Sequence, residues 1–211
     1  MSHSESTTTD RLLQAVSEGN RSALGELIRL HLPYMRRIVA LRIAPELMSR
    51  VDASDIVQEA QIVVIRRIDE YVSKRPASFR VWLRSRVIEQ LADQYRYHVS
   101  AEMRSVHRER CFSDVSSMAI ARTLLSEAPS KVLQKKELAE QVCELIESLR
   151  DIDREVLTLR HAEGLTNSEM AEALSIDPMT ARKRYGRALR RLVEMATAAG
   201  LDANLSWDAA K

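Results

Sequence analysis

Apolar residues recur every three or four positions along most of this chain, and this helical periodicity constrains its fold more than any other feature. The pattern is clear over residues 22–41, 52–70 and 178–196. The 211 residues include only 5 Gly, 5 Pro and 4% aromatic residues, which leaves little material for turns and strands. The sequence therefore predicts an all-α fold.

The periodicity weakens between residues 99 and 135, where Ser and Pro interrupt it. We predict that this stretch is a linker, with room for one or two short helical pieces. It would join an N-terminal helical bundle over residues 10–98 to a C-terminal helix-turn-helix domain over residues 136–196. A disordered tail over residues 1–9 and a C-terminal tail over residues 197–211 complete the expected organisation: two small helical domains and a linker.

Four helices are expected in the first domain. They should cover residues 10–18, a stretch that starts at Ser22, residues 52–70 and residues 78–98. Pro33 lies within the second helix and should kink or split it, because proline lacks the backbone N–H that the helix needs.

Several function classes lack the residues that they require. Cys111 and Cys143 lie far apart and form no C-x-x-C pair, and the five histidines show no metal-ligand spacing. Five scattered glycines make no phosphate-binding loop. We therefore expect no metal, no cofactor, no small-molecule substrate and no enzyme activity.

The chain is also expected to stay out of the membrane. Its longest apolar run, residues 62–65, ends at Arg66 and is far shorter than the roughly 20 residues that span a bilayer. The first ten residues are rich in Ser and Thr and lack the basic and apolar regions of a signal peptide. These features favour a cytoplasmic protein without membrane insertion.

Two adjacent helix starts define the C-terminal domain. Residues 166–169, Thr-Asn-Ser-Glu, fit a capping box, in which the Thr hydroxyl and the Glu carboxylate satisfy free N–H groups at the helix start. About ten residues later Asp177 and Pro178 suit the N-cap and the first position of a second helix. A short turn between them gives the helix-turn-helix layout.

The second of these helices separates apolar from basic residues. Its apolar side chains share one face, and its polar side is nearly all cationic although the whole chain has a net charge of only +2. Arg and Lys neutralise phosphates and donate to base edges, so this helix suits the major groove of DNA. The alternative is a solvated basic face on a structural helix, but the capping box and turn favour DNA binding. The predicted DNA contacts are Thr180, Arg182, Lys183, Arg184, Arg187 and Arg191.

The helix expected over residues 52–70 carries a different surface. Opposite its broad apolar face, a single apolar residue, Ile62, lies among polar and mostly acidic neighbours that include Asp55 and Glu59. Such a stripe suits a protein partner that presents Arg and an apolar spot. Taken alone, it also fits an ordinary solvated face.

Three motifs resemble those of one family. Residues 52–60 resemble the D-x-x-D-[LIV]-V-Q-E motif of bacterial RNA polymerase sigma factors of the extracytoplasmic-function group, within the sigma-70 family. Residues 78–83 resemble its S-F-x-x-W-L signature, and residues 155–171 resemble its C-terminal domain. The motifs stand in the family's order, and the resemblance covers residues 10–98 and 136–195.

The resemblance implies a non-enzymatic factor that binds core RNA polymerase and directs promoter-specific initiation. The N-terminal domain would correspond to sigma region 2 and bind the polymerase through Asp52, Asp55, Gln58, Glu59 and Ile62. It would also open the minus-ten element, with candidate residues Tyr71, Lys74, Arg75, Arg80, Trp82, Arg84, Glu89 and Arg96. The C-terminal domain would correspond to region 4 and read the minus-35 element.

Some positions depart from the family pattern. Glu89 stands where many members have Asn, and an ionised carboxylate favours a donor such as the cytosine amino group. Ser175 replaces the usual Gly of the turn. Tyr71 is expected to offer a surface for a flipped base, whereas core packing is the stronger interpretation for Trp82.

Two other functions stay open on the sequence. The first is a helix-turn-helix regulator that binds DNA by itself and uses its N-terminal domain for dimerisation or sensing. The second is an enzyme whose site forms only in three dimensions, for which the chain offers few candidate residues. Whether an anti-sigma factor is a further partner is also left open.

Overall fold

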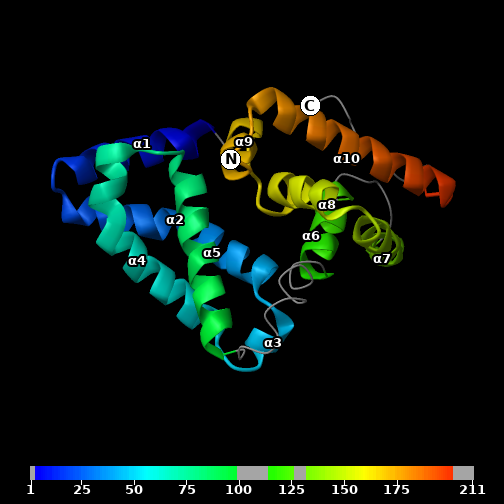
Figure 1. Ribbon diagram of the computed structural model, residues 1–211, viewed down its shortest axis with the longest axis horizontal. Helices are drawn as coiled ribbons and strands as arrows, with labels where there is room; N and C mark the ends of the chain where they lie inside the picture. Colours follow the sequence, from blue (N-terminus) through cyan, green and yellow to red (C-terminus); the bar gives the residue numbers. More distant parts are fainter. Residues whose placement is uncertain (1–2, 99–113, 126–131, 202–211) are drawn as a thin grey trace. The chain divides into compact units, whose positions relative to one another are not determined.

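The computed structural model describes residues 3–98, 114–125 and 132–201, and it divides into two units (Figure 1). Unit 1 spans Met1–Phe112 and unit 2 spans Ser113–Lys211. Within the described ranges every regular element is a helix, as the sequence predicts.

Unit 1 is a bundle in which three long helices pack on one another. Its helices are α1 (His3–Ser17), α2 (Arg21–Arg42), α3 (Pro45–Met48), α4 (Ala53–Lys74) and α5 (Phe79–His98). Helices α2, α4 and α5 all contact one another, and α1 packs on α2 and α4. Their shared core is built from apolar side chains that lie at helical spacing in the sequence; the most deeply buried are Leu27, Ile38, Ile56, Ala60 and Val87.

Helix α1 begins earlier than the sequence predicts. In place of the expected disordered tail over residues 1–9, the helix starts at His3, and Thr9 is buried. The hydroxyl oxygen of Thr9 lies 3.0 Å from Nε2 of His31 on α2. This contact between α1 and α2 stabilises the helix at a polar residue. The local sequence does not show the contact.

Pro33 does not split α2, which runs without a break from Arg21 to Arg42. Proline removes one backbone hydrogen bond from a helix interior. Here Pro33 faces solvent, while Tyr34, Met35 and Ile38 beside it are buried. Burial of this face stabilises the helix and offsets the hydrogen bond that is lost at Pro33.

Unit 2 consists of α6 (Asp114–Leu124), α7 (Val132–Glu147), α8 (Asp151–Leu157), the π-helical segment η2 (Thr158–Ala162), α9 (Asn167–Ala173) and α10 (Pro178–Ala198). Helix α10 packs on α7, α8 and α9, and α6 packs on α7 and η2. The last element predicted to be helical, residues 178–196, agrees with α10 within two residues.

The predicted linker contributes to unit 2. Helix α6 lies inside the 99–135 stretch, and its residues Ile120 and Ala121 are fully buried, with Leu125 also buried just after it. Helix α7 also begins within that stretch, at Val132. The apolar pattern did not predict this packing, because serines interrupt it and one of them, Ser117, is itself buried.

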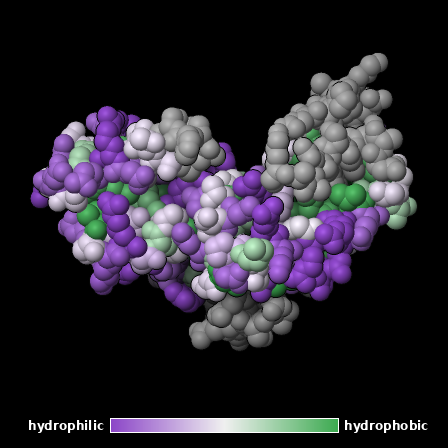
Figure 2. Space-filling model, turned by 90° about the horizontal axis from the view of Figure 1, so that it is seen from above, coloured by the Kyte–Doolittle hydropathy of each residue, from purple (hydrophilic) through white to green (hydrophobic). Residues whose placement is uncertain are grey.

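Among the described residues seen in Figure 2, hydrophilic ones predominate and hydrophobic ones appear only in small patches. None of the helices in the described ranges is both long enough and apolar enough to cross a bilayer. Trp207 and Cys111 lie outside the described residues.

Candidate partner-binding and DNA-binding surfaces

The start of α4 is fixed by the first residue of the predicted acidic stripe. Asp52 is the N-cap, and its carboxylate accepts a hydrogen bond from the backbone N–H of Ser54 at 2.7 Å. This backbone bond, with a bond to the Ser54 side chain, lowers the pKa of Asp52 below its usual value. The carboxylate is therefore ionised at neutral pH, and its charge lies at the positive end of the helix.

The α4 stripe is the surface made by Asp52, Asp55, Gln58, Glu59 and Ile62. All five side chains are exposed, and Ile62 is 46% exposed. Their spacing of three and four residues places them on one side of the helix, opposite the buried residues Ile56, Ala60 and Val64. The predicted grouping is thus present as a continuous exposed surface.

Two contacts extend this surface beyond the predicted residues. Oε2 of Glu59 accepts a hydrogen bond from Nε2 of Gln94 at 2.5 Å, which ties the stripe to α5. Ile65, one turn after Ile62, is 48% exposed. Ile65 is not among the residues predicted for this surface, so its exposure is a finding of the structure.

The candidates for minus-ten DNA fall into two groups. Lys74, Arg75, Glu89 and Arg96 are exposed, and Arg84 is half-buried. Three of these side chains are paired within the unit: Lys74 with Glu70 at 2.9 Å, Glu89 with Arg86 at 2.6 Å, and Arg96 with Asp93. Arg75 ends α4 in the left-handed region, with φ of 39°, and so turns the chain into the loop before α5.

The other three candidates are buried, and this corrects the expectation for Tyr71. The Tyr71 ring is only 3% exposed and packs 4.8 Å from the Trp82 ring, while its hydroxyl donates to the carbonyl oxygen of Ala77 at 3.0 Å. No face of the ring is available to a base in this structure. Trp82, 9% exposed, is packed in the core, as its stronger interpretation predicts.

Arg80 is also buried, at 6% exposure, with its guanidinium 4.4 Å from the centroid of the Tyr34 ring. The sequence places it among the arginines most suited to DNA. Its position over an aromatic face instead stabilises the packing of α5 on α2. Periodicity could not show this, because arginine is rarely buried.

The helix-turn-helix has the local geometry that the sequence predicts. Oγ1 of Thr166 accepts from the Glu169 backbone N–H at 3.2 Å, and Oε2 of Glu169 accepts from the Thr166 N–H at 2.8 Å, which completes the capping box. Ser175 occupies the left-handed turn position with φ of 53°. Asp177 caps α10 by accepting from the Thr180 N–H at 2.9 Å.

Helix α10 presents its basic residues to solvent. Arg182, Lys183, Arg187 and Arg190 are exposed, and Thr180 and Arg184 are half-buried. The opposite side is buried in unit 2 through Ala181, Ala188, Leu189 and Leu192.

Tyr185, half-buried, contacts Nε2 of His161 through its hydroxyl at 3.2 Å, which joins α10 to η2. Burial, with a smaller effect from the charge of Arg160, lowers the pKa of His161 to about 4, so this histidine is neutral at pH 7.

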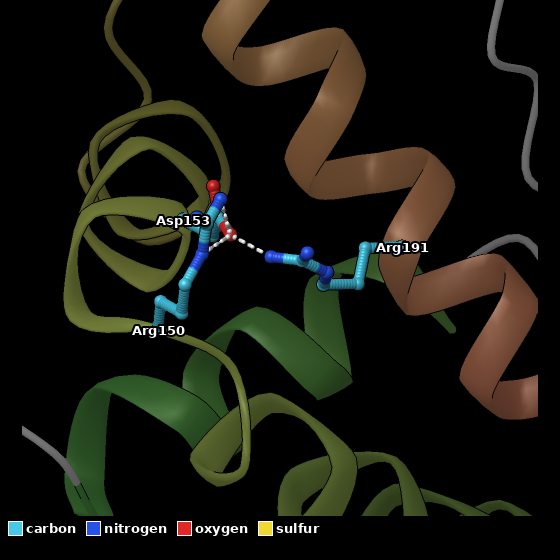
Figure 3. A network of polar contacts seen from close by, with 3 residues as sticks. All are labelled: Arg150, Asp153 and Arg191. Atoms are coloured by element: carbon cyan, nitrogen blue, oxygen red, sulfur yellow. Dashed lines mark hydrogen bonds and ion pairs between the residues drawn. The ribbon is translucent and has the colours of Figure 1, made fainter.

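Arg191 differs from the other predicted DNA-binding arginines of α10 because its side chain is paired with an acid of its own unit. Figure 3 shows Arg150 and Arg191 reaching the same side chain, that of Asp153 on α8. Nη1 of Arg191 lies 2.7 Å from Oδ2 of Asp153, and Nε of Arg150 lies 2.9 Å from the same oxygen. The sequence offered no signal for the contact with Arg191, which joins residues 38 apart.

Within the described part of the chain, no group of three or more His, Cys, Asp or Glu residues is placed to hold a metal ion. The exposed site residues are charged groups, together with the polar Gln58 and the apolar Ile62 and Ile65. A helix-turn-helix with a cationic side on one helical unit and an exposed acidic stripe on the other are the arrangement of a DNA-binding protein with a second charged surface.

Comparisons with known proteins give the family. The family model described as Sigma-70 region 2 matches residues 27–100, and that described as Sigma-70, region 4 matches residues 139–192. The chain belongs to the sigma-70 family of RNA polymerase sigma factors, in the extracytoplasmic-function group. The two matched regions fall in unit 1 and unit 2 respectively.

Relatives match along nearly the whole chain. The ECF RNA polymerase sigma-E factor of Haemophilus influenzae is 27% identical, over 90% of this chain and 95% of the relative. The RNA polymerase sigma factor CnrH of Cupriavidus metallidurans is 26% identical, over 87% of this chain and 92% of the relative. The solved structure of CnrH in complex with the cytosolic domain of CnrY has a TM-score of 0.53 and 20% identity, over 90% of this chain and 98% of that chain, and supports the fold.

Proposed function

We propose that this protein is a non-enzymatic sigma factor that works in the cytoplasm, binds core RNA polymerase and directs promoter-specific transcription initiation. The observation that carries the proposal is the presence, in one chain, of the exposed α4 stripe and the exposed cationic side of α10. The matches to sigma-70 regions 2 and 4 support it.

Unit 1 binds the polymerase through the α4 stripe. Asp52, Asp55 and Glu59 supply negative charge for cationic groups on the partner, and Ile62 supplies an apolar contact at the C-terminal end of the stripe. Interfaces of this kind draw affinity from a buried apolar centre and orientation from charged neighbours. Ile65 extends the apolar contact of Ile62 by one helical turn.

Unit 1 also contacts the minus-ten element, through the exposed residues Lys74, Arg75 and Arg96. Glu89 is exposed and selects for a base-edge donor. Tyr71 and Trp82 act from the core, where they hold the loop between α4 and α5 in place, and Arg80 holds α5 against Tyr34 of α2.

Unit 2 reads the minus-35 element with α10. Arg182, Lys183 and Arg187 are exposed on this helix, and Thr180 and Arg184 are half-buried at its N-terminal half. The first turns of a recognition helix are the part that enters the major groove in a helix-turn-helix.

A protein inhibitor is a further proposed partner. The relative CnrH has been solved in complex with the cytosolic domain of CnrY. The exposed Ile62 and Ile65 offer an apolar surface to such a partner as well as to the polymerase. An anti-sigma factor that covers them would keep the protein from the polymerase.

Run-off transcription tests the proposal. Purified core polymerase with this protein should yield defined products from a pool of randomised promoters, and core polymerase alone should not. The absence of any product that depends on both protein and promoter sequence would refute the proposal. A stand-alone regulator, the alternative, would bind selected duplexes tightly without polymerase, and no observation in the described residues favours it.

A further inference from the structure

The contact between Asp153 and Arg191 indicates that the arginines of α10 have different roles. Arg187 and Arg191 are one turn apart, so they are neighbours on the helix surface. Arg187 is exposed and its charge is available to DNA. Arg191 instead turns toward α8, where Nη1 reaches Oδ2 of Asp153 at 2.7 Å.

Asp153 is built into unit 2 as a buried anion. Its side chain is 7% exposed, and one oxygen, Oδ2, accepts from both arginines. Arg150 stands at the N-cap position of α8, and both its Nε and its Nη2 lie 2.9 Å from that oxygen (Figure 3). A buried carboxylate needs such partners, because removal from water disfavours an unpaired charge strongly.

The two arginines are not equivalent. Arg150 lies three residues from Asp153 in the chain, so its bond is local to the start of α8. Arg191 lies on α10 and is 45% exposed, so its bond is the one that ties the DNA-reading helix to α8. Apolar packing between these helices resists separation, but a directional ion pair also fixes rotation about the helix axis.

We propose that Asp153 is a positioning residue for promoter recognition: it holds Arg191 as a strut between α8 and α10 and thereby sets the orientation of the DNA-reading residues. Arg191 then contributes alignment and does not bind a phosphate. This inference rests on the proposed function, since it concerns how unit 2 reads the minus-35 element.

The test compares two readouts in the full-length protein. The first is the salt dependence of binding to a random-sequence duplex, whose slope falls by about one unit for each phosphate-binding side chain that a substitution removes. The second is discrimination, the ratio of run-off product from a selected promoter to that from the same promoter with its upstream element scrambled. Loss of a phosphate-binding side chain flattens the slope, whereas loss of the contact between Asp153 and Arg191 lowers discrimination without flattening the slope.

Arg191→Gln is the main variant, because Asp153 keeps its bonds to Arg150 and the unit should stay folded. We expect an unchanged salt slope and about a tenfold loss of discrimination, roughly the contribution of one misaligned base contact. Arg187→Gln is the comparison, and should flatten the slope by about one unit. A slope flattened equally in Arg191→Gln would overturn the proposal, and so would discrimination equal to that of the wild type.

Asp153→Asn tests the same contact by changing the partner of Arg191. It removes the charge at nearly constant volume and frees Arg191, so the slope should steepen by about one unit while discrimination falls. The double variant with Arg191→Gln should return the slope to the wild-type value. Asp151→Asn is the matched control: it lies in the same turn of α8, is exposed and pairs with Arg154, and should change neither readout.

Failure of the sigma-factor proposal would be visible separately. If the wild-type protein gives no promoter-dependent product, that proposal fails. Comparison of the salt slopes of the variants still tests whether Arg191 binds Asp153 or a phosphate, because that measurement needs neither polymerase nor a promoter. Slopes that do not differ between Asp153→Asn and the wild type would then overturn the strut.

Discussion

At the scale of single residues, burial decides the chemistry of the ionisable groups in this protein. His31 is 1% exposed, contacts Thr9 through Nε2, and packs edge-on against the Phe79 ring at 5.0 Å. Its Nδ1 has no partner among the described residues. Burial, followed by the charge of Arg80, lowers the pKa of His31 to about 4, so the ring is neutral at pH 7.

This shift predicts acid sensitivity of unit 1. In the unfolded chain His31 has its ordinary pKa of 6.5, so between pH 6.5 and pH 4 the unfolded state binds more protons. The contribution of His31 is therefore present above pH 6.5 and is lost as pH falls toward 4, by up to about 3 kcal/mol at roughly 1.4 kcal/mol per pKa unit.

Urea unfolding between pH 7 and pH 4.5, followed by Trp82 fluorescence in a Trp207→Phe background, measures this loss. His31→Gln should lower stability at pH 7 but reduce the dependence on pH, because the titrating group is gone. If His31→Gln keeps the full pH dependence, another group is responsible.

At the scale of elements, helix starts were predictable because their signals lie within one turn of the chain. Thr166 with Glu169, and Asp177 with Pro178, form the caps that the sequence indicates. Local patterns did not predict the early start of α1 or the packing of α6. The stability of these two helices depends on contacts with other helices, as Thr9 and Ile120 show.

The capping box gives a prediction for α9. Thr166→Ala removes the acceptor for the Glu169 N–H and should lower the stability of unit 2 by about 1 kcal/mol. Thr166→Ser keeps the hydroxyl and should restore most of it. Ser168→Ala, an exposed change inside the same helix, is the control. Equal thermal unfolding midpoints for Thr166→Ala and Ser168→Ala would show that the cap contributes little.

At the scale of the whole molecule, the surface proposed for the polymerase and the surface proposed for the minus-35 element lie in different units and should be separable. The α4 stripe belongs to unit 1, and the cationic side of α10 belongs to unit 2. A change in one surface should therefore leave the other intact, because each surface is carried by a separate compact unit.

Charge reversal tests the polymerase surface. Asp55→Lys with Glu59→Lys should abolish co-purification with core polymerase, because both exposed anions become repulsive toward a cationic partner. Glu18→Lys with Glu26→Lys, two other exposed acids of unit 1, is the matched control and should bind normally. Retained binding by the first pair would mean that the α4 stripe is not the polymerase surface.

The DNA surface is tested from the other unit. Arg184→Ala and Arg187→Ala should each weaken use of a selected promoter and flatten the salt dependence of DNA binding by about one unit. Co-purification with core polymerase should be unchanged. Loss of polymerase binding in these variants, with the fold intact by circular dichroism, would contradict the division between units.

The sequence by itself determined the helical class, the caps of α4, α9 and α10 and the exposed charges on α4 and α10, because each depends on residues within a few positions of one another. The tertiary structure decided which functional candidates face solvent: it buried Tyr71 and Arg80, exposed Ile65 and joined Arg191 to Asp153. These outcomes depend on which helix packs beside which, over separations of 22 to 38 residues for the contacts Thr9–His31 and Asp153–Arg191. Local periodicity places a side chain on a face of its helix, but only packing decides what that face meets.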